Sequence, residues 1–396
     1  MRSLVVAADY PWPEVGGSRI RVANTLAGLA SAGEVDLLSI VPTTRDPGDF
    51  APPPDTIAVS RVVRSSVVIR PRNTVEVLEA FLRGDPLVFP MAGPTVVRSL
   101  GEMDPSRYDL VWFFTVRAWV WAGMAHERPT VVDIDDLDDQ KIRARIALRT
   151  ASPTPRQVAT SMFWRQEIRR WERLHERIAR LTVPVLCSDI DVRRSGLPNA
   201  KVVPNGYTRP SVPLGRIPVS RDPTILFQGS LRNPPNSDAA RFLAREIAPR
   251  LVAEVPRARV RLVGSGPESL SSEIDQSSVT LVGQVPDIRS ELATADLVVV
   301  PLRFGSGTRI KILEAFAHRI PVVSTALGAE GLGARDGAHL LIADTAEGIT
   351  AACVRLLSDL RLRESLVDDA EKLFLERYES TVVSRRVREV AQQSVR

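Results

Sequence analysis

Cysteine is scarce in this chain: only Cys187 and Cys353 occur among 396 residues, far apart in the sequence. This scarcity excludes a disulfide-stapled scaffold and a zinc site built from cysteines, and it is typical of a protein kept in a reducing cytosol. Histidine is also scarce, and its four copies show no metal-ligand spacing: His126, His175, His318 and His339. We therefore expect no metal cofactor and a cytoplasmic location.

Several long runs and motifs are missing as well. No apolar run approaches the roughly 18 residues of a transmembrane helix, and no signal-peptide pattern follows Met1. No Gly-x-Ser-x-Gly elbow is present, which argues against acyl transfer by a serine, and no Gly-x-Gly-x-x-Gly follows the first apolar run, which argues against an oxidoreductase. The net charge is +5, but no basic stretch is interleaved with aromatic residues, so we expect no nucleic acid partner.

Continuous apolar runs in the first half predict a parallel sheet that is covered on both faces. The expected strands are Ser3–Ala8, Glu34–Val41, Asp109–Phe114, Thr130–Ile134 and Thr182–Cys187. Ser18–Ala32 has helical spacing, and Ser161–Leu181 is predicted to be a long amphipathic helix. Its Arg-rich face could contact an anionic membrane peripherally or simply be solvated. His175 lies opposite its apolar stripe, so we expect that side chain in solvent.

The second half alternates strands and helices more clearly, which predicts a second doubly wound α/β domain. The expected strands are 224–228, 258–263, 279–282, 296–300 and 321–324, with helices at 237–255, 287–294 and 308–318. We expect a Rossmann-like domain over 1–210, a Pro-rich linker over 211–222, a second Rossmann-like domain over 223–377 and a C-terminal helix over 378–396 that could cross back to the first domain. Ligands of such sheets bind beyond the carboxyl ends of the strands, so both domains should face a central cleft.

The most informative stretch is Pro301–Thr325, in which a strand runs into a Gly-rich turn and then a helix. Small residues let a ligand approach the backbone, and the free N–H groups of a helix start favour a phosphate. Arg309 and Lys311 add positive charge there, and Glu314 could accept hydrogen bonds from the hydroxyls of a ribose. The alternative is a tight strand–helix connection with a solvated Glu.

This stretch resembles the nucleotide-sugar site of retaining GT-B glycosyltransferases, particularly family 4. Further segments resemble that family in the same order along the chain: Gly16-Gly17 before the first helix, Val202–Gly206 before the linker, Gln228-Gly229-Ser230 with Pro235-Asn236, Val263–Pro267, Leu281–Asp287 and Gly328–Gly331. The resemblance covers nearly the whole chain and is strongest from about residue 223 to 345. It implies a GT-B fold in which two doubly wound domains face a cleft.

The resemblance also implies roles for single residues. The catalytic residues are expected to be Arg309, Lys311 and Asp135, with the first two stabilising the departing diphosphate. The nucleotide-sugar is expected to bind at Gly16, Gly17, Gly229, Ser230, Gly264, Val285, Ser306, Gly307, Thr308 and Glu314. Gly264 also has a structural interpretation, since a sharp turn needs it. No metal or other cofactor is expected besides the nucleotide-sugar co-substrate.

Two positions depart from the usual family pattern. Family 4 commonly shows two Glu residues separated by seven others; Glu314 matches the second, and Ser306 stands at the first. Many members have His where Asp135 stands in this chain. The first Glu and the His lie near the donor sugar in the family, so the contacts to that sugar are expected to differ here.

The acidic run Asp133–Asp139 has more than one interpretation. Asp133-Ile134-Asp135 could be a D-x-D metal site of the other glycosyltransferase fold, because clustered carboxylates suit a hard divalent cation. A solvated acidic helix start is the alternative, especially for Asp138 and Asp139. A single-domain metal site of that kind would leave the loop before Glu314 unexplained.

The sequence thus predicts a glycosyltransferase that moves a sugar from a nucleotide-diphosphate sugar, with retention and without metal. The acceptor is not identified; a secondary metabolite, a polysaccharide or a glycolipid would each fit. A nucleotide-sugar epimerase of GT-B architecture and a non-catalytic nucleotide-sugar-binding subunit are the alternatives.

Overall fold

A computed structural model of the chain describes residues 1–147, 155–211, 222–266, 268, 270–271, 273–274, 278–305 and 309–395. The chain forms two compact units. Unit 1 comprises Met1–Gly206 together with Thr381–Arg396, and unit 2 comprises Tyr207–Ser380. The linker expected at 211–222 falls almost wholly outside the described residues.

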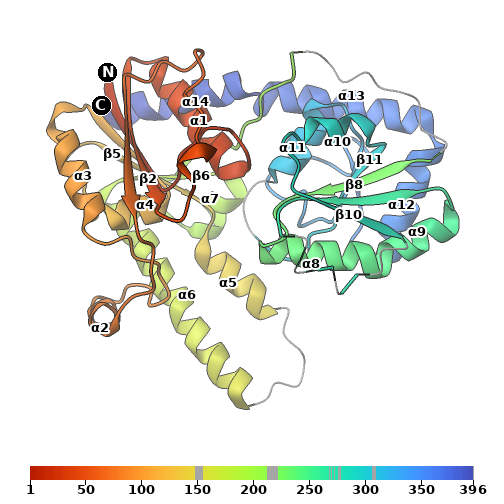
Figure 1. Ribbon diagram of the computed structural model, residues 1–396, viewed down its shortest axis with the longest axis horizontal. Helices are drawn as coiled ribbons and strands as arrows, with labels where there is room; N and C mark the ends of the chain where they lie inside the picture. The colour runs from red at the N-terminus through yellow and green to blue at the C-terminus, as the bar shows by residue number, and fades with distance from the viewer. Residues whose placement is uncertain are drawn as a thin grey trace. The chain divides into compact units, whose positions relative to one another are not determined.

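Unit 1 is built around a seven-stranded sheet with the order β3-β2-β1-β4-β5-β6-β7, and its strands pair in parallel (Figure 1). The strands are β1 (Arg2–Ala7), β2 (Glu34–Pro42), β3 (Arg61–Val67), β4 (Leu110–Phe114), β5 (Thr130–Asp135), β6 (Val183–Leu186) and β7 (Lys201–Val202). The helices are α1 (Gly17–Ala30), α2 (Thr74–Arg83), α3 (Thr95–Met103), α4 (Val116–Trp121), α5 (Asp138–Ala147), α6 (Pro155–Leu181), α7 (Asp189–Ser195) and α14 (Ser380–Val395). The parallel, doubly wound arrangement expected from the continuous apolar runs is confirmed.

The C-terminal helix α14 completes the core of unit 1. Val383, Val387 and Val390 are buried in one cluster with residues of β1 and α1. A Cβ on Gly28 of α1 would lie 2.5 Å from the carbonyl oxygen of Ser384, so the two helices pack backbone to backbone. Only glycine permits this approach, and the last helix is therefore part of the first unit's fold.

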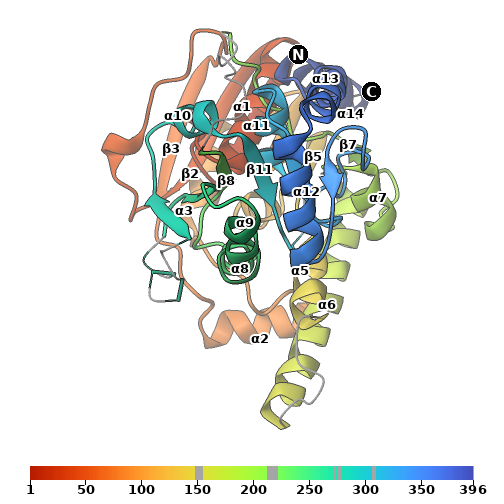
Figure 2. The ribbon, with the colours of Figure 1, turned by 90° about the vertical axis from the view of Figure 1, so that its right-hand side faces the viewer.

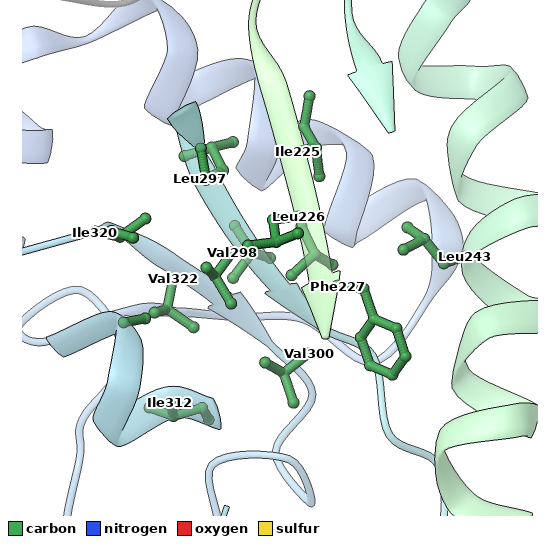
Figure 3. Packing of buried hydrophobic residues seen from close by; sticks show 14 of the residues in the cluster. Ile225, Leu226, Phe227, Leu243, Leu297, Val298, Val300, Ile312, Ile320 and Val322 are labelled. Carbon is green, nitrogen blue, oxygen red and sulfur yellow. The ribbon is translucent and has the colours of Figure 1, made fainter. Parts of the chain in front are cut away.

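Unit 2 is a six-stranded parallel sheet with the order β10-β9-β8-β11-β12-β13 (Figure 2). Its strands are β8 (Thr224–Gln228), β9 (Arg259–Val263), β10 (Val279–Gly283), β11 (Leu297–Val300), β12 (Val322–Ser324) and β13 (Leu341–Ile342). Its helices are α8 (Pro234–Phe242), α9 (Ala248–Glu254), α10 (Arg289–Thr294), α11 (Ile310–Ala317), α12 (Ala346–Ser358) and α13 (Leu360–Arg377). Apolar side chains of β8, β11 and β12 pack in one cluster with Ile312 of α11 and with Leu243, which lies between α8 and α9 (Figure 3).

Two regions differ from their sequence-based expectation. The single helix expected at 237–255 begins earlier and contains a π-helical turn, Leu243–Ile247, between α8 and α9. The region between 45 and 105 contains β3, α2 and α3, for which no element was expected. Among the described residues, no helix is long and apolar enough to cross a membrane.

Candidate functional site

The first part of the candidate site is a crowded pair of glycine turns in unit 2. Gly229 follows β8 and Gly264 follows β9, and both have φ near +150°. The Gly229 amide donates to the Val263 carbonyl at 2.9 Å, and a Cβ on Gly264 would lie 1.9 Å from the Gly229 carbonyl oxygen. These strands are neighbours, so their carboxyl ends present two backbone turns with no side chain between them.

Helix α11 presents a carboxylate to the end of β8. The Nε2 of Gln228 donates to the Oε2 of Glu314 at 3.1 Å. Burial raises the pKa of Glu314, while the hydrogen bond from Gln228 and the charge of Lys311 act in the opposite direction. Gln228 is 5% exposed, and its Oε1 is buried without a hydrogen-bond partner within the described part of the chain. The pair therefore has an unused acceptor beside a carboxylate.

A lysine of the same helix lies over the glycine turn. The Nζ of Lys311 donates to Asn236 Oδ1 at 2.7 Å and stands 4.4 Å from the centre of the Phe227 ring. A Cβ on Gly229 would lie 3.0 Å from this Nζ. Burial and the nearby charge of Arg309 lower the pKa of Lys311 to about 7. Among the described residues, no carboxylate forms an ion pair with this Nζ, so an anionic ligand would stabilise its charged form.

The other predicted residues of unit 2 take different places. The carbonyl oxygen of Ser230 accepts a hydrogen bond from Asn236 Nδ2 at 2.9 Å. Its hydroxyl oxygen accepts one from Ser265 Oγ at 3.0 Å. Val285 is half-buried and packs against the hydrophobic core of the unit. Arg309 is the N-cap residue of α11. The predicted residues Ser306, Gly307 and Thr308 lie outside the described residues.

The predicted residues Gly16, Gly17 and Asp135 belong to unit 1. Gly16 has φ +90° at the start of α1, and a Cβ there would meet no atom within 4 Å. Gly17 is the first residue of that helix, which follows the carboxyl end of β1. This places a helix N-terminus at the edge of the sheet where ligands of doubly wound folds bind.

Asp135 lies in a buried network that sequence reasoning missed. Arg21 of α1 donates to both carboxylate oxygens of Asp133, at 2.9 and 2.8 Å, and its Nε is 3.7 Å from Asp135 Oδ1. Arg21 also donates to Asn205 Oδ1 and the Val203 carbonyl oxygen, at 3.0 and 2.9 Å. Arg21 and Asp133 are 2% and 0% exposed. Asp133 is thus bound inside the protein as an ion-pair partner.

The remainder of the acidic run also differs from expectation. Asp139 is buried and lies 3.5 Å from Nδ1 of His175, which is itself 3% exposed. The prediction of a solvent-exposed His175 is therefore wrong, and the alternative of a solvated helix start does not hold for Asp139, because α6 folds its His-bearing face against the start of α5. Within the described ranges, no group of three or more His, Cys, Asp or Glu residues is placed to hold a metal ion.

Comparison with known proteins relates the segment that holds this site to a family. Residues 222–359 match the family described as glycosyl transferases group 1. The match lies wholly within unit 2. The match contains every described site residue of unit 2, from Gln228 to Glu314. The resemblance drawn from the Gly-rich stretch is thereby confirmed at the level of the family.

Curated relatives align with part of this chain. The phosphatidyl-myo-inositol mannosyltransferase of Mycolicibacterium smegmatis is 31% identical over 174 residues, which are 42% of this chain and 44% of the relative. An uncharacterised 44.6 kDa protein of the Klebsiella pneumoniae cps region is 25% identical over 129 residues, 30% of this chain and 33% of its own. The alignments span less than half the length of these relatives.

Solved structures match over the full length. The Anabaena protein HepE, crystallised with UDP and glucose, has a TM-score of 0.65 at 17% identity, with 99% of both chains covered. Sucrose-phosphate synthase from Thermosynechococcus elongatus gives 0.65 at 18%, covering 99% of this chain and 98% of its own. WaaG, a glycosyltransferase involved in lipopolysaccharide biosynthesis, gives 0.66 at 14%, with 99% of both chains covered. The two doubly wound units of the chain thus have the GT-B fold.

Proposed function

We propose that this protein is a glycosyltransferase that binds a nucleotide-diphosphate sugar in unit 2 and transfers the sugar to an acceptor. The observation that carries the proposal is the convergence of Lys311, Glu314 and Gln228 on the Gly229 turn of a group 1 glycosyltransferase domain. A cation, a carboxylate and an unused amide acceptor around an open backbone turn suit a ribose with its diphosphate. The UDP and UDP-glucose complexes of HepE support this donor class.

Lys311 and Arg309 would act on the leaving group. Cleavage of the bond between the sugar and the diphosphate places negative charge on the departing phosphate oxygens. Lys311, held at the turn by Asn236, would gain stabilisation as that charge develops, which is the condition for lowering the barrier. We propose transfer with retention of anomeric configuration and without a metal ion, with acceptors among secondary metabolites, polysaccharides or glycolipids.

Donor turnover tests the proposal directly. Purified protein is incubated with UDP-glucose and other nucleotide sugars, and release of the nucleoside diphosphate is followed with and without EDTA. We expect slow hydrolysis in the absence of an acceptor, unaffected by EDTA. Arg309→Ala should lower turnover more than donor affinity, whereas Arg361→Ala, an exposed site on α13, should change neither. Tight donor binding without any turnover, even with acceptors present, would instead favour a non-catalytic subunit.

We also propose peripheral membrane contact through unit 1. Helix α2 exposes a cluster of apolar side chains: Val75, Leu78, Phe81 and Leu82 are 58–74% exposed. Helix α6 exposes Arg165, Arg169 and Arg173. An apolar face beside arginines suits the interface of an anionic bilayer.

A further inference from the structure

Unit 1 contains a pocket that the proposed donor site does not use. It has a volume of about 210 Å³ and lies among α4, α5, α6 and the segment before α3. Its apolar walls come from Val88, Ile142, Ile146, Trp164 and Trp171. This volume is below the roughly 300–1,000 Å³ of sites that enclose a drug-sized ligand. The pocket therefore fits one part of a larger molecule.

One aromatic wall of the pocket is buried and the other is half-exposed. Trp171 is 6% exposed, and its ring centroid lies 5.6 Å from that of Phe89, with the ring planes tilted by 39°. Trp164 is half-buried and meets the ring of Phe163 edge-on at 5.3 Å. Aromatic walls of this kind provide large apolar contact area at a fixed position.

The polar side of the pocket is formed by Arg117 of α4 and by the first turn of α5. Asp138 and Lys141 line it, and Lys141 Nζ lies 3.2 Å from Asp136 and 3.5 Å from Asp138. This turn comes directly after β5, so it stands at the carboxyl edge of the sheet of unit 1. Ligands of doubly wound sheets bind at that edge. A polar group there would therefore be held where chemistry takes place in this class of fold.

Apolar surface continues beyond the mouth of the pocket. Val88 lines the pocket and is still 53% exposed, and Phe163, the neighbour of Trp164, is 40% exposed. A compact aromatic group would end inside the walls, whereas a flexible chain could follow this surface outward. Each buried methylene of such a chain contributes about 0.8 kcal/mol.

We propose that this pocket binds the apolar chain of an amphiphilic acceptor, with its polar end beside Asp138 and Lys141. The acceptor class is thus a lipid-like molecule with an exposed polar head. The role of this molecule as the acceptor rests on the proposed function. The binding of an amphiphile in unit 1 does not depend on that function.

Alkyl β-D-glucosides test the pocket. Methyl, hexyl, octyl and decyl glucoside, each below its critical micelle concentration, are titrated into the full chain by calorimetry. We expect no heat of binding with methyl glucoside and an affinity that rises by up to about fourfold for each added methylene that is buried. Trp164→Ala should weaken octyl glucoside at least tenfold, and Trp164→Phe should restore most of the affinity. Leu82→Ala, on the exposed face of α2, should leave the affinity unchanged.

The outcomes separate the pocket from the donor site. Equal affinity for methyl and octyl glucoside, or the same loss in Leu82→Ala as in Trp164→Ala, would overturn the pocket proposal. Ile146→Asp gives a second variant should Trp164→Ala fail to fold. The same preparations are titrated with UDP: octyl glucoside binding without UDP binding would contradict the proposed function and leave the pocket in place.

Discussion

The two units have similar sheets but use their charged residues differently. In unit 1, Arg21 and Asp133 are buried and hydrogen-bonded to each other, and Arg21 has further protein acceptors in Asn205 and Val203. In unit 2, the Nζ of Lys311 donates to the amide oxygen of Asn236, and no carboxylate among the described residues pairs with it. A charge that is fully satisfied inside the protein stabilises the fold, whereas a half-satisfied charge at an open turn is suited to a ligand. Substitutions of the buried pair in unit 1 should therefore lower stability, whereas substitution of Lys311 in unit 2 should weaken ligand binding.

The largest effect is expected for Arg21→Ala. The substitution leaves Asp133 buried without its ion-pair partner, so we expect the free energy of unfolding to fall by about 3–5 kcal/mol. Urea denaturation followed by circular dichroism measures it. Arg19→Ala is the matched control, because Arg19 pairs with the part-exposed Asp9 and should cost less than about 1 kcal/mol. Equal losses in the two variants would contradict the structural role of the buried pair.

Gly264→Ala should come next. The added Cβ would lie 1.9 Å from the Gly229 carbonyl oxygen, and Gly264 has φ +149°. Backbone strain of this type costs about 1–3 kcal/mol, before any clash is relieved. The clash can be relieved only if the Gly229 turn moves. UDP binding, measured by calorimetry, should therefore weaken together with the free energy of unfolding, measured by urea denaturation. Gly16→Ala, also at a positive φ (+90°) but with open space around the Cβ, should affect stability less.

Lys311→Met should weaken UDP binding by about 10- to 100-fold, as expected for a hydrogen bond between charged groups worth about 1.5–3 kcal/mol. The affinity for UDP should also change with pH in a defined direction. Free Lys311 has a pKa near 7, and a bound diphosphate favours its protonated form. The affinity of the wild type should therefore fall as the pH rises from 7 to 9, a range in which the phosphate ionisation near pH 6 is complete. Lys311→Met removes the titrating amine and Lys311→Arg stays charged, so both variants should give flat profiles. A slope that persists in Lys311→Met would contradict this assignment.

The smallest effect on stability is expected on α2. Leu78→Ser with Leu82→Ser removes side chains that are 58% and 74% exposed, so the free energy of unfolding should change by less than about 0.5 kcal/mol for each. The fraction of the protein that sediments with phosphatidylglycerol vesicles should nevertheless fall. Val395→Ser, at an exposed apolar site on α14, is the control. Unchanged sedimentation would remove the support for membrane contact through this face.

The sequence predicted the parallel sheets well because buried parallel strands form continuous apolar runs, as in Leu297–Val300. It also carried signals that were passed over. Asn73 and Glu76 form a capping box at the start of α2, and Gly84 ends the helix with φ +72°. Those residues mark a helix although its apolar face is exposed.

Other features could not be predicted because they depend on long-range packing. Arg21 and Asp133 are 112 positions apart, and nothing in the local pattern pairs them; the only signal was an Asp inside the apolar run of β5. Gln228 and Glu314 are 86 positions apart, and the family resemblance suggested their loops without their contact. Exposure of His175 was predicted wrongly because α5 covers that face of α6.

Thermal melting with nucleoside diphosphates tests the central claim most directly. UDP, GDP, ADP and dTDP are each added with and without Mg²⁺, since a ligand that binds only the native state raises the midpoint. We predict a rise with at least one diphosphate that does not require Mg²⁺, is lost in Glu314→Ala and is retained in Glu364→Ala, an exposed site on α13. No rise with any of the four in folded protein, or an equal rise in both variants, would contradict a nucleotide site at Gly229, Lys311 and Glu314.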